Sequence, residues 1–382
     1  MEEKKKYPFL KSIVILCTLA LLLTAGTGCL IQYMPVLTEA AYEKLHHDPE
    51  PTETEPPPDI DQPAFYLSKG FGSFEETEAC SEIEQETETQ IILTEQIPEP
   101  EITDPGEKPY PETWNLTGGI VEQMRYDLYS GERFFDLPDA GQVQNKTALS
   151  NAELYEESQR LPEFSIQTDS TPQVLIMHTH TTESFEPYER AYYDSSFNYR
   201  TTDHSKNVVM IGNAIAAQLE AAGIGVIHDS TVHDYPSYTG SYERSAETVK
   251  NLLIQYPSIK IVLDIHRDAI GGNGVIKQPV AEINGKKASQ VMIISGCDDG
   301  SMNMPNYLKN FRFACLLQQQ METDYPGLTR PILFDYRKYN QDLTTGSILI
   351  EVGSHGNTLD QVRYAGELIG SSLARALQKL EE

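Results

Sequence analysis

Histidines and carboxylates that follow apolar runs are the residues of this chain best suited to carry chemistry. His180 and Glu183 follow the run 174–177, whose β-branched and long aliphatic residues predict a buried strand. Their spacing, where the strand gives way to a loop, lets an imidazole nitrogen and a carboxylate oxygen converge on one cation of the zinc class. The alternative is a strand end whose histidines only hydrogen-bond to the backbone.

Two further predicted strands end in groups of the same chemical kind. His266 follows the run 259–265, and Glu351 follows the run 347–350. If these strands are parallel, their carboxyl ends meet at one edge of the sheet, where open α/β sheets build their sites. Two imidazoles and one carboxylate leave the fourth position of a tetrahedral zinc open for water, and Glu351 would take that water's proton. The pattern predicts a metal-dependent hydrolase with His180, Glu183 and His266 as the metal ligands.

Neighbouring residues leave the ligand set open. On a strand, His178 points to the same face as His180, so it could compete with it as a ligand or support it. His204 competes for the place given to Glu183. Two nitrogens and one oxygen also permit manganese or iron in place of zinc.

Three charged residues flank His266. Asp264 either orients an imidazole, as metal-bound histidines usually require, or is a strand-end carboxylate in solvent. Arg267 either acts in the catalytic site by binding a substrate carboxylate bidentately, or forms an ion pair with Asp268.

The remaining polar candidates lie away from these strand ends. His228, His233 and His355 are predicted to be surface residues. The polar segment 339–341 precedes the strand of Glu351 and could line a groove or form a plain loop.

The order of predicted elements indicates the fold class. From residue 173 onward strands and helices alternate, which predicts an α/β fold with a mixed, mostly parallel sheet flanked by helices. Between 113 and 164 the pattern suggests only a short amphipathic element at 119–126 and a helix at 149–161. The predicted strands are 174–177, 225–229, 259–265, 291–295 and 347–350, and the predicted helices are 207–222, 242–256, 306–321 and 359–380.

Composition argues against nucleic-acid binding and against structural sites built from cysteine. The chain carries 57 acidic and 29 basic residues, for a formal net charge of −28, and no basic patch is visible. Binding to nucleic acid is therefore not expected, because phosphate contacts need clustered Lys and Arg. The five cysteines form no CxxC pair, which argues against a disulfide framework and against thiolate zinc sites.

The N-terminal third predicts a membrane tether. Residues 1–11 are predicted as a cytoplasmic tail and 12–34 as a transmembrane anchor, because lysines precede an uncharged apolar run long enough to span a bilayer. A cleaved signal peptide or a lipoprotein signal are the alternatives. The acidic, Pro/Glu/Thr-rich segment 35–112 is predicted as a disordered linker. A lead-in segment at 113–165 and a catalytic domain at 166–382 follow.

Several of these motifs, taken in order, resemble a known family. The motifs at 178–184, 264–269, 339–341 and 350–354, together with Asn357-Thr358, resemble the stage II sporulation protein P family of endospore-forming bacteria. The resemblance covers the chain from about residue 173 to its end. It implies a zinc-dependent N-acetylmuramoyl-L-alanine amidase fold and a membrane-anchored peptidoglycan hydrolase.

The resemblance also implies roles for residues and partners. His180 and His266 match the family's metal histidines, and Glu351 matches its catalytic glutamate. Glu183 is the preferred third ligand, because its His-x-x-Glu spacing is similar to that of zinc carboxypeptidases. In the wider superfamily a glutamate near the first helix takes this place. In this chain the corresponding segment, 203–207, has the sequence Asp-His-Ser-Lys-Asn. The family is expected to cut the muramoyl-alanine amide and stem-peptide cross-links.

The expected setting follows from the same resemblance. The enzyme would act with stage II sporulation proteins D and M in septal thinning and forespore engulfment, as a single-pass membrane protein with its catalytic domain outside the cytoplasm. Two other functions stay open at this point: a zinc peptidase of other extracellular peptides, and a non-catalytic wall-binding scaffold.

Overall fold

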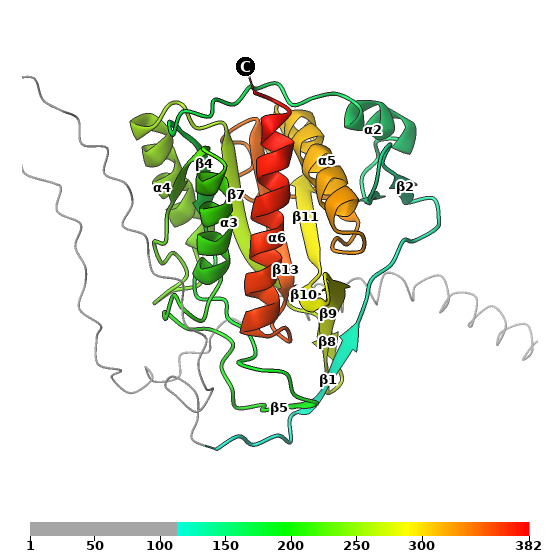
Figure 1. Ribbon diagram of the computed structural model, residues 1–382, viewed down its shortest axis with the longest axis vertical. Coiled ribbons are helices and arrows are strands. Elements are labelled where there is room, and N and C mark those ends of the chain that lie inside the picture. Colours follow the sequence, from blue (N-terminus) through cyan, green and yellow to red (C-terminus); the bar gives the residue numbers. More distant parts are fainter. Residues whose placement is uncertain (1–112, 382) are drawn as a thin grey trace, which may run out of the picture. The chain divides into compact units, whose positions relative to one another are not determined.

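A computed structural model describes residues 113–381 (Figure 1). The predicted tail, anchor and acidic linker lie outside these residues. None of the described helices is long and apolar enough to cross a membrane. The elements are β1 (Gly119–Met124), β2 (Phe134–Asp136), β3 (Gln142–Asn145), α2 (Asn151–Ser158), β4 (Pro172–Met177), β5 (Tyr192–Tyr193), α3 (Val209–Ala221), β6 (Gly225–His228), α4 (Ser241–Gln255), β7 (Ile261–Asp268), β8 (Gly271–Gly272), β9 (Val275–Ile283), β10 (Lys286–Ser289), β11 (Val291–Gly296), α5 (Tyr307–Asp324), β12 (Ile332–Asp335), β13 (Gly346–Ser354) and α6 (Leu359–Gln378).

An eight-stranded sheet contains all the predicted strands. Its order is β2-β3-β12-β11-β13-β7-β4-β6. Strands β13, β7, β4 and β6 are parallel to one another, whereas β11, β12 and β3 form a second parallel group that runs the opposite way. All five predicted strands belong to this sheet, which confirms the prediction of a mixed, mostly parallel sheet with flanking helices.

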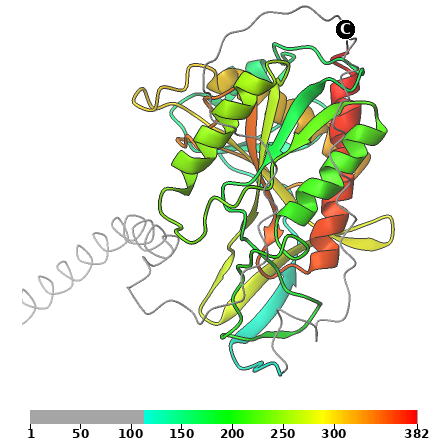
Figure 2. The ribbon, with the colours of Figure 1, turned by 90° about the vertical axis from the view of Figure 1, so that its left-hand side faces the viewer.

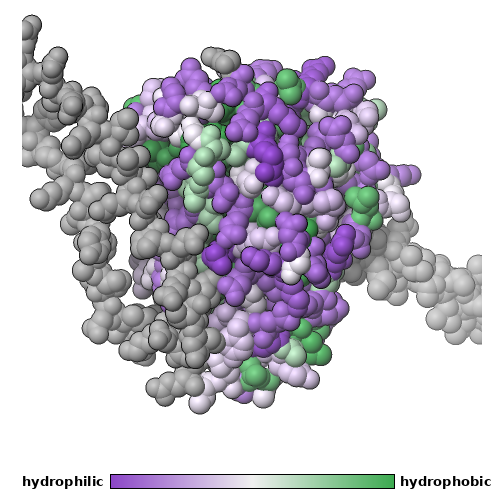
Figure 3. Space-filling view, in the orientation of Figure 1, coloured by the Kyte–Doolittle hydropathy of each residue, from purple (hydrophilic) through white to green (hydrophobic). Residues whose placement is uncertain are grey.

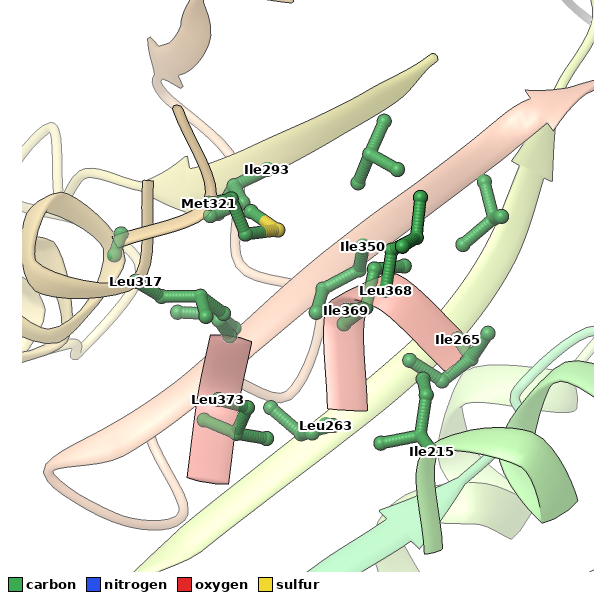
Figure 4. Packing of buried hydrophobic residues seen from close by; sticks show 14 of the residues in the cluster. Ile215, Leu263, Ile265, Ile293, Leu317, Met321, Ile350, Leu368, Ile369 and Leu373 are labelled. Atoms are coloured by element: carbon green, nitrogen blue, oxygen red, sulfur yellow. The ribbon is translucent and has the colours of Figure 1, made fainter. Parts of the chain in front are cut away.

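Helices cover both faces of this sheet (Figure 2). Side chains alternate along β4, so that Ile176 packs in the core with α3 and α6 while Met177 packs with Val249 of α4. Figure 4 shows Ile265 of β7 and Ile350 of β13 on the face of α3, α5 and α6. The outer surface over these three helices is mostly hydrophilic (Figure 3). The residues that follow Ile265 and Ile350 in sequence point to the other face, under α4.

A second, smaller sheet was not predicted. Its order is β10-β9-β1-β5, and β8 pairs with β9. The β9–β10 hairpin turns at Asn284 and Gly285, whose φ angles are 51° and 76°. Asn-Gly is the pair that two-residue hairpin turns favour, because both central residues need positive φ. The sequence therefore contained a signal for this hairpin.

The predicted lead-in segment 113–165 contributes strands to both sheets. The amphipathic element predicted at 119–126 is strand β1, which pairs with β9 and β5, and β3 pairs with β12. Trp114 lies against the guanidinium of Arg190, whose central carbon is 3.9 Å from the ring centroid. Residues 113–165 therefore share both sheets with the residues from 166 onward.

The start of α6 fixes the end of β13. The Thr358 side chain accepts a hydrogen bond from the backbone of Gln361, and the Gln361 side chain accepts one from the backbone of Thr358, which is a capping box. Asn357 Oδ1 accepts a hydrogen bond of 2.8 Å from the Ser354 backbone. These contacts give Asn357 and Thr358 a structural role just beyond the strand that carries Glu351.

Candidate active site

Three neighbouring strands bring the predicted residues to one edge of the large sheet. Strands β13, β7 and β4 are adjacent and parallel, so their carboxyl ends lie together. His266 on β7 and Glu351 on β13 are paired in register, on the face covered by α4. His180 and Glu183 follow β4, and a 3.1 Å hydrogen bond from the Glu183 backbone to the His180 carbonyl closes the turn between them. His180, Glu183 and His266 are all buried.

His266 lies among carboxylates. Its Nε2 is 2.8 Å from Asp264 Oδ1, and its Nδ1 is 3.7 Å from Glu183 Oε2. The Asp264 carboxylate is out of line with the ring N–H, so the buried Nε2 has no well-aligned hydrogen bond. Burial alone would lower the pKa of His266, but the charges of Asp264, Glu183 and Glu351 outweigh it and raise the pKa to about 9.

Asp264 is buried and joins β7 to the segment after β4. Its two carboxylate oxygens accept hydrogen bonds from the Thr179 backbone at 2.8 Å and from the Thr179 hydroxyl at 2.7 Å. Burial raises the pKa of Asp264, but His266 and these donors lower it by more. Asp264 is thus a buried anion against an imidazole, as an orienting residue would be, and is no solvent-exposed carboxylate.

His180 presents a neutral imidazole to the cluster. Its ring lies edge-to-face with the His266 ring, with centroids 5.2 Å apart. The Tyr238 hydroxyl lies 3.0 Å from His180 Nε2. Burial lowers the pKa of His180 to about 4, against the opposing charge of Glu183, so that the ring keeps a lone pair at neutral pH.

Glu183 stays ionised although it is buried. Its Oε2 accepts a 3.0 Å hydrogen bond from the Arg267 backbone N–H. Burial raises the pKa of Glu183, but Arg267, His266 and His180 together lower it below its ordinary value. An ionised carboxylate beside two imidazoles is the donor chemistry that a divalent cation requires.

Glu351 holds its proton more tightly than an ordinary carboxyl group. The residue is half-buried, yet its Oε2 is fully buried and without a hydrogen-bond partner. Burial and the charge of Asp268 raise the pKa of Glu351 to about 8, against His266. Asp268 itself forms a 2.8 Å ion pair with Arg330.

Arg267 contacts protein backbone. Its Nε donates to the Ser184 carbonyl at 3.2 Å and its Nη2 to the Tyr199 carbonyl at 3.3 Å. The guanidinium therefore holds the segment 184–199 against β7. The alternative of an ion pair with Asp268 is not seen, because Arg330 takes that place.

The two competing histidines lie elsewhere. His178 Nδ1 is 3.1 Å from the Ile265 carbonyl oxygen and its Nε2 is 2.9 Å from His228 Nε2, so both ring nitrogens are occupied. His204 is half-buried, the charge of Asp203 raises its pKa against burial, and its own charge lowers the pKa of His228.

The surface position predicted for His233 is wrong. Its side chain is buried. The ring nitrogens contact the His178 carbonyl at 2.8 Å and the Thr248 hydroxyl at 3.0 Å. The ring therefore anchors the backbone just ahead of His180, which is a structural role that a lone histidine in a loop does not reveal.

Two tyrosines beside the histidines were not anticipated. Tyr238 stacks on the His180 ring with centroids 4.5 Å apart. Tyr242, at the start of α4, lies edge-to-face with His180 and parallel to His266. Both come from a loop and a helix start whose sequences carry no chemical pattern. Tyr339 and Asn340 of the predicted segment 339–341 line a groove together with Tyr242, whereas Gln341 is buried and does not.

His180, Glu183 and His266 supply the nitrogen and oxygen donors that a divalent cation binds. Their donor atoms do not converge on a single position. Two ligands of tetrahedral zinc lie about 3.3 Å apart, and Glu183 Oε2 is 3.7 Å from His266 Nδ1. Within residues 113–381 no group of three or more His, Cys, Asp or Glu is in metal-binding geometry. The unsatisfied Glu351 Oε2, with carboxylates around the His266 imidazole, nevertheless marks this edge as a place for positive charge.

Comparison with protein families gives a match over most of the chain. The family model of stage II sporulation protein P matches residues 91–374. Stage II sporulation protein P of Bacillus subtilis (strain 168) is 32% identical over 206 residues, which are 50% of this chain and 48% of that protein. The alignment thus spans about half the length of this relative.

Solved structures show weaker similarity. The N-acetylmuramoyl-L-alanine amidase AmiC2 of Nostoc punctiforme is 14% identical, with 54% of this chain and 96% of that chain covered and a TM-score of 0.32. The catalytic domain of the CD27L endolysin targeting Clostridia difficile is 11% identical, with 55% and 99% covered and a TM-score of 0.35. The catalytic domain of CwlV, an N-acetylmuramoyl-L-alanine amidase from Bacillus (Paenibacillus) polymyxa var. colistinus, is 12% identical, with 54% and 97% covered and a TM-score of 0.30.

Proposed function

The chain belongs to the stage II sporulation protein P family, and from this premise we propose that it is a zinc-dependent peptidoglycan hydrolase. One observation carries the proposal. His180, Glu183, His266 and Glu351 come from three separate strand ends and gather at one edge of the sheet. Buried groups of this kind, with pKa values moved by burial and by one another, are typical of reaction centres.

Three of these residues would hold the metal. His180 and His266 would bind it through ring nitrogens and Glu183 through a carboxylate oxygen. Asp264 would steady His266 from the opposite ring nitrogen, as carboxylates commonly do for metal-bound histidines. Zinc in this place would polarise the carbonyl of the bond to be cut and lower the pKa of water.

Glu351 is the proposed proton carrier. As water adds to the amide carbon, the Glu351 carboxylate takes the water's proton and then gives it to the departing nitrogen, so that the C–N bond breaks with a neutral amine leaving. Burial and the charge of Asp268 raise the pKa of Glu351 above its ordinary value, which favours a carboxyl group that accepts and returns a proton. The paired position of His266 keeps Glu351 next to the metal ligands.

The proposed substrates are amides of the bacterial wall. We propose cleavage of the N-acetylmuramoyl-L-alanine amide and of stem-peptide cross-links, since the same site can hydrolyse either amide. The proposed setting is the sporulation septum during engulfment, outside the cytoplasm, with the anchor at residues 12–34 holding the protein at the membrane. Stage II sporulation proteins D and M are the proposed partners.

Metal content and wall digestion test this function together. The full-length chain is purified in detergent, its zinc is measured, and purified sacculi are digested with the products read by mass spectrometry. We expect one zinc per chain and release of stem peptides, with both lost in His180→Ala and His266→Ala. A protein with no metal and no products would contradict the proposal, and a zinc-loaded protein that cleaves extracellular peptides but not sacculi would contradict the substrate.

A further inference from the structure

Tyr242 occupies a position between the histidines and a groove. Its ring is nearly parallel to that of His266, with centroids 6.5 Å apart, and lies edge-to-face with that of His180 at 5.5 Å. On its other side the ring of Tyr339 stacks on it at 5.3 Å. Tyr242 also lines a groove of about 560 Å³ beside α4. Tyr242 therefore contacts the two histidines and also borders this groove.

The side chain of Tyr242 contacts its neighbours through its ring, and its hydroxyl forms no hydrogen bond with residues 113–381. Only the backbone carbonyl of Tyr242 accepts hydrogen bonds. Its neighbours differ, since the Tyr238 hydroxyl contacts His180 and the Tyr339 hydroxyl accepts from Arg337 at 2.6 Å. Tyr242 is half-buried and its hydroxyl is not among the buried polar atoms that lack a partner, so the hydroxyl is accessible to solvent and can donate to a ligand that displaces water beside the two histidines.

The loop that holds Tyr242 in place is strained. Tyr339 and Asn340 have φ angles of 43° and 54°, in the left-handed region that residues other than glycine seldom adopt. The Asn340 amide donates to the Tyr242 carbonyl at 2.8 Å and to the Ser245 hydroxyl at 3.1 Å. Such conformations are unfavourable and cluster at functional sites. Here the strained pair keeps the Tyr339 ring pressed against Tyr242.

The next residue ties this loop to the sheet. Gln341 is buried, and its amide donates to the Ile294 carbonyl at 3.0 Å while its side-chain oxygen accepts from the Gly296 backbone at 2.9 Å. The loop is thus fastened to β11 at one end and to α4 at the other. This gives the segment 339–341 a purpose, because it fixes the orientation of the Tyr242 ring.

We propose that Tyr242 is a further catalytic residue, whose hydroxyl donates a hydrogen bond to the carbonyl oxygen of the amide being cut. The proposal rests on the hydrolase function proposed above. When water adds to the carbonyl carbon, the electron pair of the C=O double bond moves to that oxygen, and the hydroxyl stabilises the charge that develops. When the C–N bond breaks, the pair returns and Glu351 delivers the proton to nitrogen. Tyr242 keeps its own proton throughout.

Kinetics of Tyr242→Phe give the first test. This change removes only the hydroxyl and keeps the ring that stacks on Tyr339. We expect kcat on sacculi to fall about 100-fold, as for loss of an oxyanion donor in other enzymes, while KM, zinc content and thermal unfolding midpoint stay at wild-type values. The matched control is Tyr192→Phe, which removes an exposed hydroxyl on β5 and should leave kcat unchanged. A Tyr242→Phe protein with wild-type kcat would overturn the proposal.

Binding of a tetrahedral probe separates this proposal from the proposed function. A phosphinic dipeptide carries two oxygens on a tetrahedral centre and needs no turnover. We expect the zinc-loaded Tyr242→Phe protein to bind it at least about 10-fold more weakly than wild type, whereas equal binding contradicts a role for the hydroxyl. If wild type binds zinc and the phosphinate but does not digest sacculi, the proposed substrate is wrong. The ratio of the phosphinate affinities of wild type and Tyr242→Phe still decides the role of Tyr242. A wild type that binds neither overturns both.

Discussion

Glu351 and His266 stand at paired positions of two parallel strands, β13 and β7, and point to the same face of the sheet. Parallel neighbours of this kind keep their side chains at a fixed separation. A carboxyl group with a raised pKa is thereby held next to an imidazole surrounded by carboxylates. Glu351 and His266 are the structural centre of the proposed hydrolase.

Substitution of Glu183 and of His204 should distinguish the two candidates for the third metal ligand. Glu183→Gln should weaken zinc binding strongly, because it replaces an ionised ligand next to His266 with a neutral amide. His204→Ala should leave zinc affinity at the wild-type value. Competition with a chromogenic chelator measures both affinities. The reverse ranking would move the third ligand to the start of α3.

Loss of the Asp264 charge should weaken the metal without removing it. We expect Asp264→Asn to lower zinc affinity about 10- to 100-fold, since carboxylates behind metal-bound histidines contribute by this much. The control is Thr179→Val, which removes one hydrogen bond to the same carboxylate but leaves the contact with His266. Both variants should lower the unfolding midpoint. Equal zinc affinity in Asp264→Asn and wild type would show that Asp264 serves only to join β7 to the segment after β4.

The lead-in segment should be needed for stability. Trp114→Ala removes the ring over the Arg190 guanidinium and should lower the free energy of unfolding by about 2 kcal/mol. Trp114→Phe keeps an aromatic face and should cost less. Urea unfolding measures both free energies. Circular dichroism is the signal to follow, since Trp114 is the one tryptophan of the chain and the variants lose tryptophan fluorescence. Wild-type stability in Trp114→Ala would mean that this contact does not hold the segment to the domain.

The half-buried His228 should make the domain less stable in mild acid. Burial lowers the pKa of His228 to about 4, below the ordinary value of 6.5. Between these two values the unfolded chain binds the proton more strongly, so stability is lost as the pH falls from 6.5 toward 4. His228→Gln should flatten this part of the stability curve. Parallel curves for wild type and His228→Gln would refute this contribution.

The sequence was most informative where a strand ends. Apolar runs that turn polar within one residue located β4, β7 and β13 and singled out His180, His266 and Glu351. What no local pattern contains is that these strands are neighbours in the order β13-β7-β4. That order depends on long-range packing, and only the parallel direction of these strands was assumed from the sequence.

The parts that prediction missed have physical reasons. Tyr242 begins a helix, where an aromatic residue is ordinarily a core residue, and its unpaired hydroxyl depends on which neighbours the fold brings. The small sheet pairs β1 with β9, from distant parts of the chain, and only the Asn284-Gly285 turn could have signalled one of its hairpins. His233 looked like a surface residue because its partners are a backbone carbonyl and Thr248.

The most direct measurement compares wild type with Glu351→Gln in the full-length chain, in metal content and sacculus digestion. The amide cannot take a proton from water, yet it preserves the shape of the residue beside His266. The account predicts one zinc in both proteins, stem-peptide release by wild type, and release reduced by several orders of magnitude in the variant. Loss of zinc from Glu351→Gln would show that Glu351 is a metal ligand, and wild-type digestion by the variant would show that it carries no proton.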